Sequence, residues 1–183
     1  VDAIKFQYRN IENAYSDSIN EIGDEILFDQ IKKNYLSPSE LLELTEYANA
    51  LNMEVGISFF DSHDMRDFGE LIGSFDFLKL PSAELMNTEL ADAMLETGLF
   101  VYISTGGHSE SELEKIFTRF TGQRWMAMHC VSNYPVSIQN SRLGYLNHMQ
   151  NKWGMTVGYS SHDENWEVCI LAMHQGAEVI ERH

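Results

Sequence analysis

The feature that most constrains the fold of this 183-residue chain is a regular alternation of short apolar segments with longer amphipathic ones. Seven short strand-like segments occur, and most of them are apolar nearly throughout, which is typical of parallel strands covered on both faces. They span residues 3–7, 54–60, 76–81, 99–105, 125–132, 155–161 and 178–183. Strands that alternate with helices predict a parallel sheet, and therefore an α/β fold.

Helix signals fill most of the intervals between these segments. Ser37 stands three residues before Glu40, and Ser109 stands three before Glu112, so each pair predicts a capping box. The predicted helices span 37–51, 82–98, 109–120 and 163–177, the last capped by Asp163, with a further helical stretch near 141–151. Residues 8–36 lack clean periodicity, and we expect a long loop with some helix there.

Two architectures fit this alternation: a doubly wound open sheet and a (β/α)8 barrel. No Gly-rich dinucleotide fingerprint follows a strand, whereas polar residues follow almost every strand. Convergence of many strand ends on one site favours the barrel. A barrel needs eight strands and about 250 residues. We therefore expect an incomplete TIM barrel with strands 2 to 8 present and the first strand and the last helix missing.

Composition limits the partners and the compartment. The formal net charge of −16 argues against nucleic-acid binding, which needs clustered Lys and Arg. Cys130 and Cys169 both lie in apolar runs, so we interpret them as buried small side chains in a reducing compartment. No apolar stretch approaches the length of a membrane span. The sequence thus predicts a cytoplasmic protein with neither nucleic-acid nor membrane partners.

Two histidines stand at the carboxyl ends of consecutive predicted strands. His162 and His183 could meet on one metal ion, because neighbouring parallel strands lie about 4.8 Å apart. Two unrelated polar strand ends are the alternative, and the spacing alone does not choose between Mn, Zn and Fe. His129 lies inside an apolar strand, where a hydrogen-bonded core residue is the first interpretation and direct chemistry the second.

Charged residues inside predicted strands form a second candidate site. Lys5 and Lys79 are notable because burying an ammonium is costly unless it is paired. Lys79 and Ser82, at a strand-to-helix turn, could form an oxyanion cradle with the helix N-terminus. Alternatively, Lys79 could extend along the barrel rim into water. Glu84 and Glu181 are candidate acid–base groups or structural residues, and Glu181 should share a strand face with His183.

Several motifs occur in a fixed order along the whole chain: "KLPSAEL-N", "ISTGG", "HCVSNYP", "RLGYL", "VGYSSHD" and "GAEVIERH". In these motifs the sequence resembles the N-acetylneuraminate (sialic acid) synthase family, which includes spore-coat polysaccharide biosynthesis synthases. The resemblance implies a TIM barrel that condenses phosphoenolpyruvate with an N-acetylated aldose, such as N-acetylmannosamine. The products would be a nonulosonic (sialic-type) acid and phosphate, formed with C–O cleavage.

The resemblance also assigns roles to individual residues. It implies a divalent metal, most often Mn with Mg or Co as options, held by His162 and His183. Lys79, Glu84 and Glu181 would be the catalytic residues, with Glu181 beside the second metal ligand. The implied substrate-binding residues are Lys5, Ser58, Lys79, Ser82, Ser132 and Ser160 for phosphoenolpyruvate, and Gln7, Glu84 and Tyr134 for the sugar.

The sequence departs from the family pattern near the first metal ligand. Ser161 replaces the usual Asp of "SDH", Asp163 replaces the usual Thr, and Ala83 replaces a Gly. The Ser161 change favours one alternative, a catalytically altered barrel that only binds sugar or phosphoenolpyruvate. The second alternative is another phosphoenolpyruvate–aldose condensing enzyme, although that class lacks the ordered set of motifs.

The resemblance also sets an expectation for the domain organisation. Residues 1–183 would form one partial barrel domain without the family's C-terminal antifreeze-like domain. That piece would have little activity by itself, and the full-length protein would be a homodimer.

Overall fold

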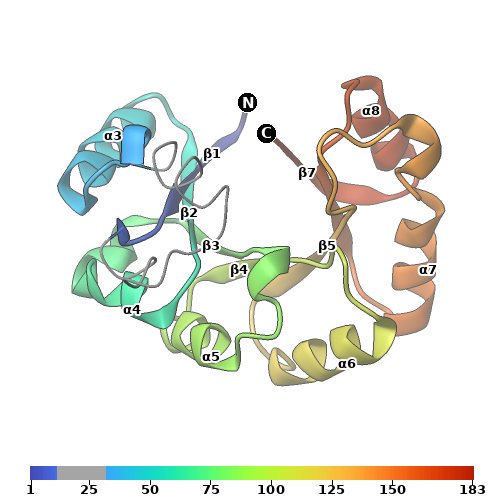
Figure 1. Ribbon diagram of the computed structural model, residues 1–183, viewed down its shortest axis with the longest axis horizontal. Helices are drawn as coiled ribbons and strands as arrows, with labels where there is room; N and C mark the ends of the chain where they lie inside the picture. Colours follow the sequence, from blue (N-terminus) through green and yellow to red (C-terminus); the bar gives the residue numbers. More distant parts are fainter. Residues whose placement is uncertain (12–31) are drawn as a thin grey trace, which may run out of the picture.

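The computed structural model describes residues 1–11 and 32–183 and contains one parallel sheet with helices along its outer side (Figure 1). Seven strands were predicted, and each is present within a few residues of its predicted bounds. They are β1 (Ala3–Tyr8), β2 (Glu54–Phe59), β3 (Phe77–Leu80), β4 (Phe100–Ser104), β5 (Trp125–Cys130), β6 (Val157–Ser161) and β7 (Ala177–Arg182).

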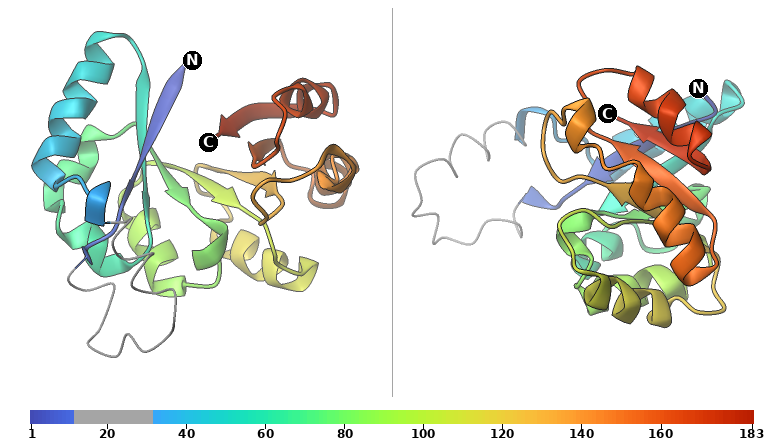
Figure 2. Two further views of the ribbon diagram at one scale, coloured as in Figure 1. Left: turned by 45° about the horizontal axis from the view of Figure 1, so that its top comes forward. Right: turned by 90° about the vertical axis from the view of Figure 1, so that its right-hand side faces the viewer.

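The strands lie in the sheet in their sequence order, β1 to β7, and every neighbouring pair is parallel. The sheet curls so that β1 and β7, its two edges, approach each other (Figure 1 and Figure 2). This curled sheet confirms the TIM-barrel-like fold and excludes the doubly wound order. The numbering of the strands as 2 to 8 of a full barrel stays a prediction.

Within the described parts of the chain, five longer helices connect the strands on the outer side (Figure 1). They are α3 (Pro38–Ala50), α5 (Thr88–Glu96), α6 (Glu110–Arg119), α7 (Gly144–Trp153) and α8 (Glu167–His174). Both predicted capping boxes are confirmed, at Ser37 with Glu40 and at Ser109 with Glu112. In each box the serine hydroxyl and the glutamate carboxylate satisfy backbone N–H groups that the first helical turn leaves free.

Two predicted helix starts are wrong. Residues 82–98 do not form one helix: a short 3-10 turn, η2 (Ser82–Glu84), comes first, and α5 begins only after Asn87, whose side chain accepts from the Leu90 N–H. Asp163 does not cap α8, which begins four residues later. Its carboxylate is instead buried and bonded to two hydroxyl groups.

Sequence patterns also missed the short helix α4 (Ser62–Arg66) and the 3-10 segment η1 (Gly69–Ser74), which lie between β2 and β3. They are too short to show periodicity. A third 3-10 turn, η3 (Ile138–Asn140), precedes α7. Most of the loop expected over residues 8–36 falls on 12–31, outside the described residues.

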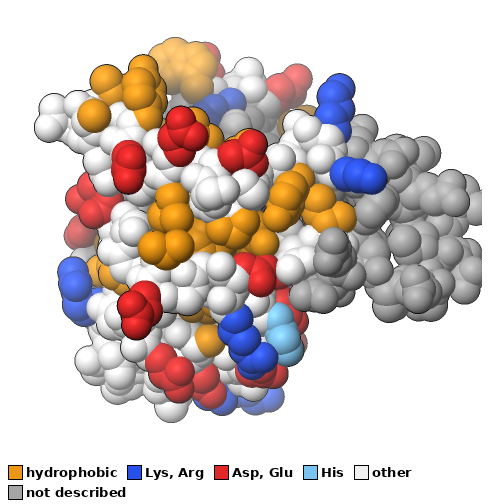
Figure 3. All heavy atoms as spheres, turned by 90° about the vertical axis from the view of Figure 1, so that its left-hand side faces the viewer, with side chains coloured by type: hydrophobic (Ala, Val, Ile, Leu, Met, Phe, Trp, Pro, Cys, Tyr) orange, Lys and Arg blue, Asp and Glu red, His pale blue; other side chains and the backbone are white. Residues whose placement is uncertain are grey.

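The core lies between the strands and the helices. Val55, Ile57, Leu78 and Ile103 are fully buried strand residues, and Leu90 of α5 packs over the same layer with no exposure. The face that carries α3 and α4 shows apolar side chains among acidic ones (Figure 3). Within residues 1–11 and 32–183, no helix is long and apolar enough to span a bilayer.

Candidate functional site at the strand tips

The parallel register brings the predicted polar residues to one end of the sheet. Gln7 pairs with Ser58, and Ser58 pairs with Lys79, so three neighbouring strands present them at one level. On the other edge, Ser160 pairs with Glu181. Because carboxyl ends of parallel strands converge when a sheet curls, residues far apart in sequence meet there.

Glu181 lies at the centre of a buried charged cluster. Its Oε2 is 2.8 Å from Lys79 Nζ and accepts a 2.7 Å hydrogen bond from Ser160 Oγ. Its Oε1 is 3.4 Å from Lys5 Nζ, at a geometry that makes no hydrogen bond, and is otherwise without a partner among the described residues. Lys5 donates to Ser58 Oγ at 3.1 Å. Two ammonium groups, from β1 and β3, thus share one carboxylate from β7.

Burial and mutual charge set the protonation of this cluster. Burial by itself raises the pKa of Glu181, but Lys79 and Lys5 outweigh it and bring this pKa down to about 2. Burial lowers the pKa of Lys5, Glu181 partly opposes that shift, and Lys79 adds to it. The Lys79 side chain is only 5% exposed, so Lys79 does not extend along the rim into water. Both strand lysines are therefore paired in the structure, and Glu181 is their shared partner.

Ser104 at the tip of β4 also belongs to this cluster. Lys79 Nζ donates to Ser104 Oγ at 2.6 Å, inside the barrel. The oxyanion cradle expected from Lys79, Ser82 and a helix N-terminus is wrong in one part, because no α-helix begins at Ser82. Ser82 Oγ instead accepts from the Gly106 N–H at 3.0 Å and donates to Cys130 Sγ at 3.6 Å.

Three polar side chains, those of Ser82, Cys130 and Ser132, pack against the backbone of Gly106. A Cβ added there would lie 2.3 Å from Ser132 Oγ, 2.9 Å from Cys130 Sγ and 3.1 Å from Ser82 Oγ. Any side chain at this position would press against polar groups from two strand ends, those of β3 and β5. The loop after β4 therefore needs glycine so that Ser82, Cys130 and Ser132 can pack against its backbone.

His162 and His183 lie together at the tips of β6 and β7, as the sequence predicts. Their ring centroids are 5.1 Å apart, and Tyr134 stacks on His162 at 3.9 Å. His162 Nδ1 donates to the Val131 carbonyl at 2.7 Å, which leaves Nε2 as the lone-pair nitrogen. The Tyr134 hydroxyl lies 2.7 Å from that nitrogen.

The residues at this position fit a divalent metal as two imidazole ligands. A backbone carbonyl that fixes the tautomer of one ring is the usual outer-shell arrangement around metal-binding histidine. Burial lowers the pKa of His183, with Glu181 opposing and Lys5 adding to the shift, so this ring favours the neutral form that binds metals. Among the described residues, no group of three or more His, Cys, Asp or Glu is arranged around a metal position.

The three predicted sugar-binding residues lie outside the charged cluster. Gln7 is exposed at the tip of β1. Glu84 is half-buried in η2, where its carboxylate accepts from Asn87 Nδ2 at 3.1 Å. Tyr134, the third, is mostly exposed above His162. These three residues surround the buried centre without contacting Glu181 or the lysines, and their roles stay predictions.

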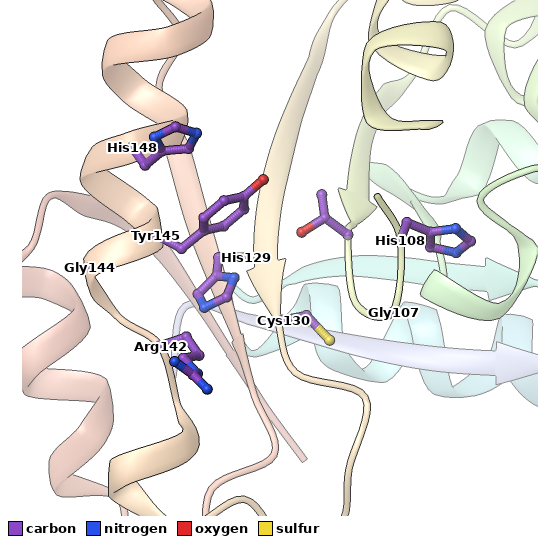
Figure 4. Close-up of a pocket in the computed structure, with 9 residues that line it drawn as sticks. Gly107, His108, His129, Cys130, Arg142, Gly144, Tyr145 and His148 are labelled. Atoms are coloured by element: carbon purple, nitrogen blue, oxygen red, sulfur yellow. The ribbon is translucent and has the colours of Figure 1, made fainter. Parts of the chain in front are cut away.

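A hollow of about 510 Å³ lies beside β5, between the starts of α6 and α7. His129 lines it, is 5% exposed, and bonds through Nε2 to the Ser141 carbonyl at 2.9 Å. Figure 4 shows Tyr145 beside His129, with the ring of His108 turned away from both. The geometry supports the interpretation of His129 as a hydrogen-bonded core residue. The hollow shares Cys130 with the strand-tip cluster.

Sequence reasoning missed Gly106 and Cys130 as site residues, and it noted Ser104 as a polar residue at a strand end without giving it a role. Ser104 and Gly106 lie in the "ISTGG" motif, so their position after a strand was the available signal. Cys130 is buried as expected, yet its Sγ lies 3.9 Å from His162 Nδ1. Nothing in the spacing of an apolar run separates such a cysteine from a core one.

A curled parallel sheet with helices on its outer side and polar residues gathered at its strand tips is a TIM-barrel-like arrangement. Comparison with known proteins then defines the family. Residues 1–183 match the model of the NeuB family. The chain belongs to the NeuB family.

Similar proteins carry the names of sugar-acid synthases. The chain is 29% identical over 197 residues to N,N'-diacetyllegionaminic acid synthase of Legionella pneumophila, an alignment that covers all of this chain and 55% of the relative. It is 27% identical over 157 residues to N-acetylneuraminate-9-phosphate synthase of Drosophila melanogaster, which covers 82% of this chain and 42% of the relative. The chain thus spans about half the length of the curated relatives it matches.

A solved structure supports the fold over the same range. The N-acetylneuraminic acid (sialic acid) synthetase of Leptospira borgpetersenii, in complex with citrate, superposes with a TM-score of 0.88 at 29% identity. The superposition covers all of this chain and 62% of that one.

Proposed function

We propose that the strand-tip cluster binds phosphoenolpyruvate and condenses it with an N-acetylated aldose to give a nonulosonic acid and phosphate. The observation that carries this proposal is the pair of buried ammonium groups, Lys5 and Lys79, joined by one carboxylate. Two buried cations amid serine hydroxyls suit a small ligand that carries both a phosphate and a carboxylate. Such a basic centre within a chain of net charge −16 is a local property of the strand tips.

The chain's own residues would hold the phosphoenolpyruvate in place. Lys5 and Lys79 supply charge, while Ser58, Ser82, Ser132 and Ser160 supply hydroxyl donors from neighbouring strand ends. The Gly106 N–H, which now points at Ser82, adds a backbone donor beside them. Groups fixed on rigid strands lose little freedom on binding, so much of the rate enhancement would come from orientation and electrostatics.

The reaction balances without a redox partner. The methylene carbon of phosphoenolpyruvate forms a bond to the aldehyde carbon of the aldose, and the aldehyde oxygen takes up a proton. Water adds to the carbon that bears the phosphate, and the C–O bond to phosphate then breaks to leave a ketone. Glu181 would stay ionised, because its lowered pKa keeps it anionic beside the cationic carbon that develops. Glu84 and Tyr134 would orient the sugar from the rim.

His162 and His183 would hold the divalent metal ion, with Mn the best candidate. When bound, such an ion supplies Lewis acidity toward the aldehyde oxygen. The Tyr134 hydroxyl, which lies at His162 Nε2, would have to yield that nitrogen to the ion. Its exposed position at the rim allows this movement.

Phosphate release tests the proposal. The protein as its gene encodes it is incubated with phosphoenolpyruvate, Mn²⁺ and each member of a panel of N-acetylhexosamines. The proposal requires release that depends on both the aldose and the metal ion. Phosphate release that does not depend on the aldose, or no phosphate release with any sugar of the panel, would exclude a synthase. A binding module would then be the function.

A further inference from the structure

We propose that Asp163, through Ser161 and Arg182, forms a clamp on the outer side of the β6 and β7 tips that positions the two histidines. The inference rests on the proposed function, because it assumes that His162 and His183 are metal ligands. It assigns a positioning role to Asp163, the residue that the sequence predicted as a helix cap.

The clamp lies opposite the metal side of the same two strands. Successive side chains of extended backbone point to opposite sides, so Ser161 and Asp163 should both face away from His162. Their mutual hydrogen bond, 2.8 Å from Ser161 Oγ to Asp163 Oδ2, shows that they share a side. Arg182 lies between Glu181 and His183 and contacts Ser161, which places it on the outer side as well.

Hydrogen bonds of this clamp join the two strands. Asp163 Oδ2 accepts from Tyr159 Oη at 2.5 Å as well as from Ser161. Ser161 Oγ in turn accepts from Arg182 Nη1 at 3.2 Å, and Arg182 Nη2 reaches the Glu164 carbonyl at 3.5 Å. The order Tyr159, Asp163, Ser161, Arg182 therefore connects β6 to β7 directly behind the histidine pair.

The same segment fixes the loop that carries Tyr134. The Val136 N–H donates to the His162 carbonyl at 2.9 Å, and the Glu164 N–H donates to the Val136 carbonyl at 3.2 Å. Asp163 stands between these two backbone contacts and is 6% exposed. A shift of Asp163 would consequently move His162 and the Tyr134 ring stacked on it.

The carboxylate is retained at a cost. Asp163 Oδ1 is buried with no hydrogen-bond partner among the described residues, and an unsatisfied buried polar atom costs free energy. An apolar residue would avoid that cost, so stability alone does not explain the aspartate. Asp163 instead supplies the acceptor that holds two hydroxyl groups at once.

The two departures beside His162 then have one explanation. The family pattern places Asp before the histidine and Thr after it, whereas this chain has Ser161 before and Asp163 after. The side chains at positions 161 and 163 lie next to each other on the same side of the chain. Both the family pattern and this sequence therefore allow a hydroxyl group to donate to a carboxylate. The exchange conserves total volume approximately, which cores tolerate well. The hydrogen bond between the two positions is thus kept, with the hydroxyl and the carboxylate exchanged between 161 and 163.

Metal affinity in a double-mutant cycle tests the clamp. Mn²⁺ binding is measured by calorimetry on the encoded protein and on D163T, S161D and the double variant S161D/D163T. D163T removes the carboxylate, and S161D sets two carboxylates against each other. We expect each single variant to lose about 10-fold to 100-fold in affinity, as outer-shell changes do. The double variant should return to within about threefold of the original, because it restores the bond.

Two controls make the outcomes separable. H162A should abolish Mn²⁺ binding, and D76A, which removes only the acceptor of the Val55 N–H at the far end of the sheet, should leave it unchanged. Undiminished binding by H162A would refute the metal site and the clamp together. Loss in H162A with wild-type affinity in D163T would refute the clamp alone.

The double variant decides the outcome when a single variant does not fold. If a single variant does not fold, wild-type-like affinity in S161D/D163T supports the exchange, and a loss of affinity there overturns it.

Discussion

Replacing Glu181 by glutamine should leave two buried ammonium groups without a counter-charge. The fall of the Glu181 pKa from 4.5 to about 2 corresponds, at about 1.4 kcal/mol per unit, to on the order of 3 kcal/mol. Removing one partner of a buried ion pair costs a similar amount, about 3–5 kcal/mol. Glutamine keeps the shape and can still accept from Ser160, so the loss reports on charge.

Thermal unfolding near pH 7 measures this loss. A domain of this size should unfold about 6–12 °C lower for a loss of about 3 kcal/mol. The difference in melting temperature between E181Q and the original protein should shrink as the pH rises. The pKa of Lys5, already lowered by burial, falls further in E181Q, so the folded state releases that proton before the unfolded state does. Stability then rises with pH between the lowered pKa and the ordinary value of 10.5.

Phosphoenolpyruvate gives the same variant a functional readout. An anionic ligand would replace the lost carboxylate, so it should raise the melting temperature of E181Q more than that of the original protein. A control substitution, Glu178→Gln on the exposed side of β7, should change neither value. A melting temperature of E181Q within about 1 °C of the original would refute the buried-charge reasoning, as would equal stabilisation of both proteins by the ligand.

Three further predictions concern other parts of the site. Lys79→Met should abolish detectable phosphoenolpyruvate binding in calorimetry while the fold survives in circular dichroism; unchanged affinity would place the anion elsewhere. Gly106→Ala should cost up to about 100-fold in kcat/KM, because the new methyl group displaces Ser132 Oγ, and wild-type kinetics would contradict that packing. His129→Gln should reduce the acid sensitivity of unfolding. Burial lowers the pKa of His129 in the folded state, so stability falls as the pH drops below about 6.5, where the unfolded state gains the proton; an identical pH profile in both proteins would contradict this.

The fold was largely predictable because its dominant signals are local. Apolar runs identified all seven strands, and the boxes at Ser37 and Ser109 located two helix starts. The start of α5 was missed because Ser82 offers the same capping chemistry as Asn87, and only the path of the chain chooses between them. Asp163 was misassigned for a similar reason. It is a residue type that often caps helices, but its carboxylate accepts a hydrogen bond from Ser161 instead.

The sequence identified many of the residues of the candidate site, but it did not show which of them contact one another. Lys5, Lys79 and Glu181 each stood out in the sequence, yet nothing in their spacing shows that one carboxylate lies between two ammonium groups. That contact depends on the curl of the sheet, which brings β1 and β3 toward β7. Likewise the partner of Ser161 on β7, Arg182, follows from strand register and not from sequence distance.

The fate of the bridging oxygen of phosphoenolpyruvate tests the central claim most directly. The encoded protein is given phosphoenolpyruvate labelled with ¹⁸O between carbon and phosphorus, together with Mn²⁺ and an N-acetylhexosamine that supports turnover. The account predicts that the released phosphate carries the label and that K79M releases none. Label retained in the keto acid, or labelled phosphate formed without the sugar, would contradict condensation at the strand tips.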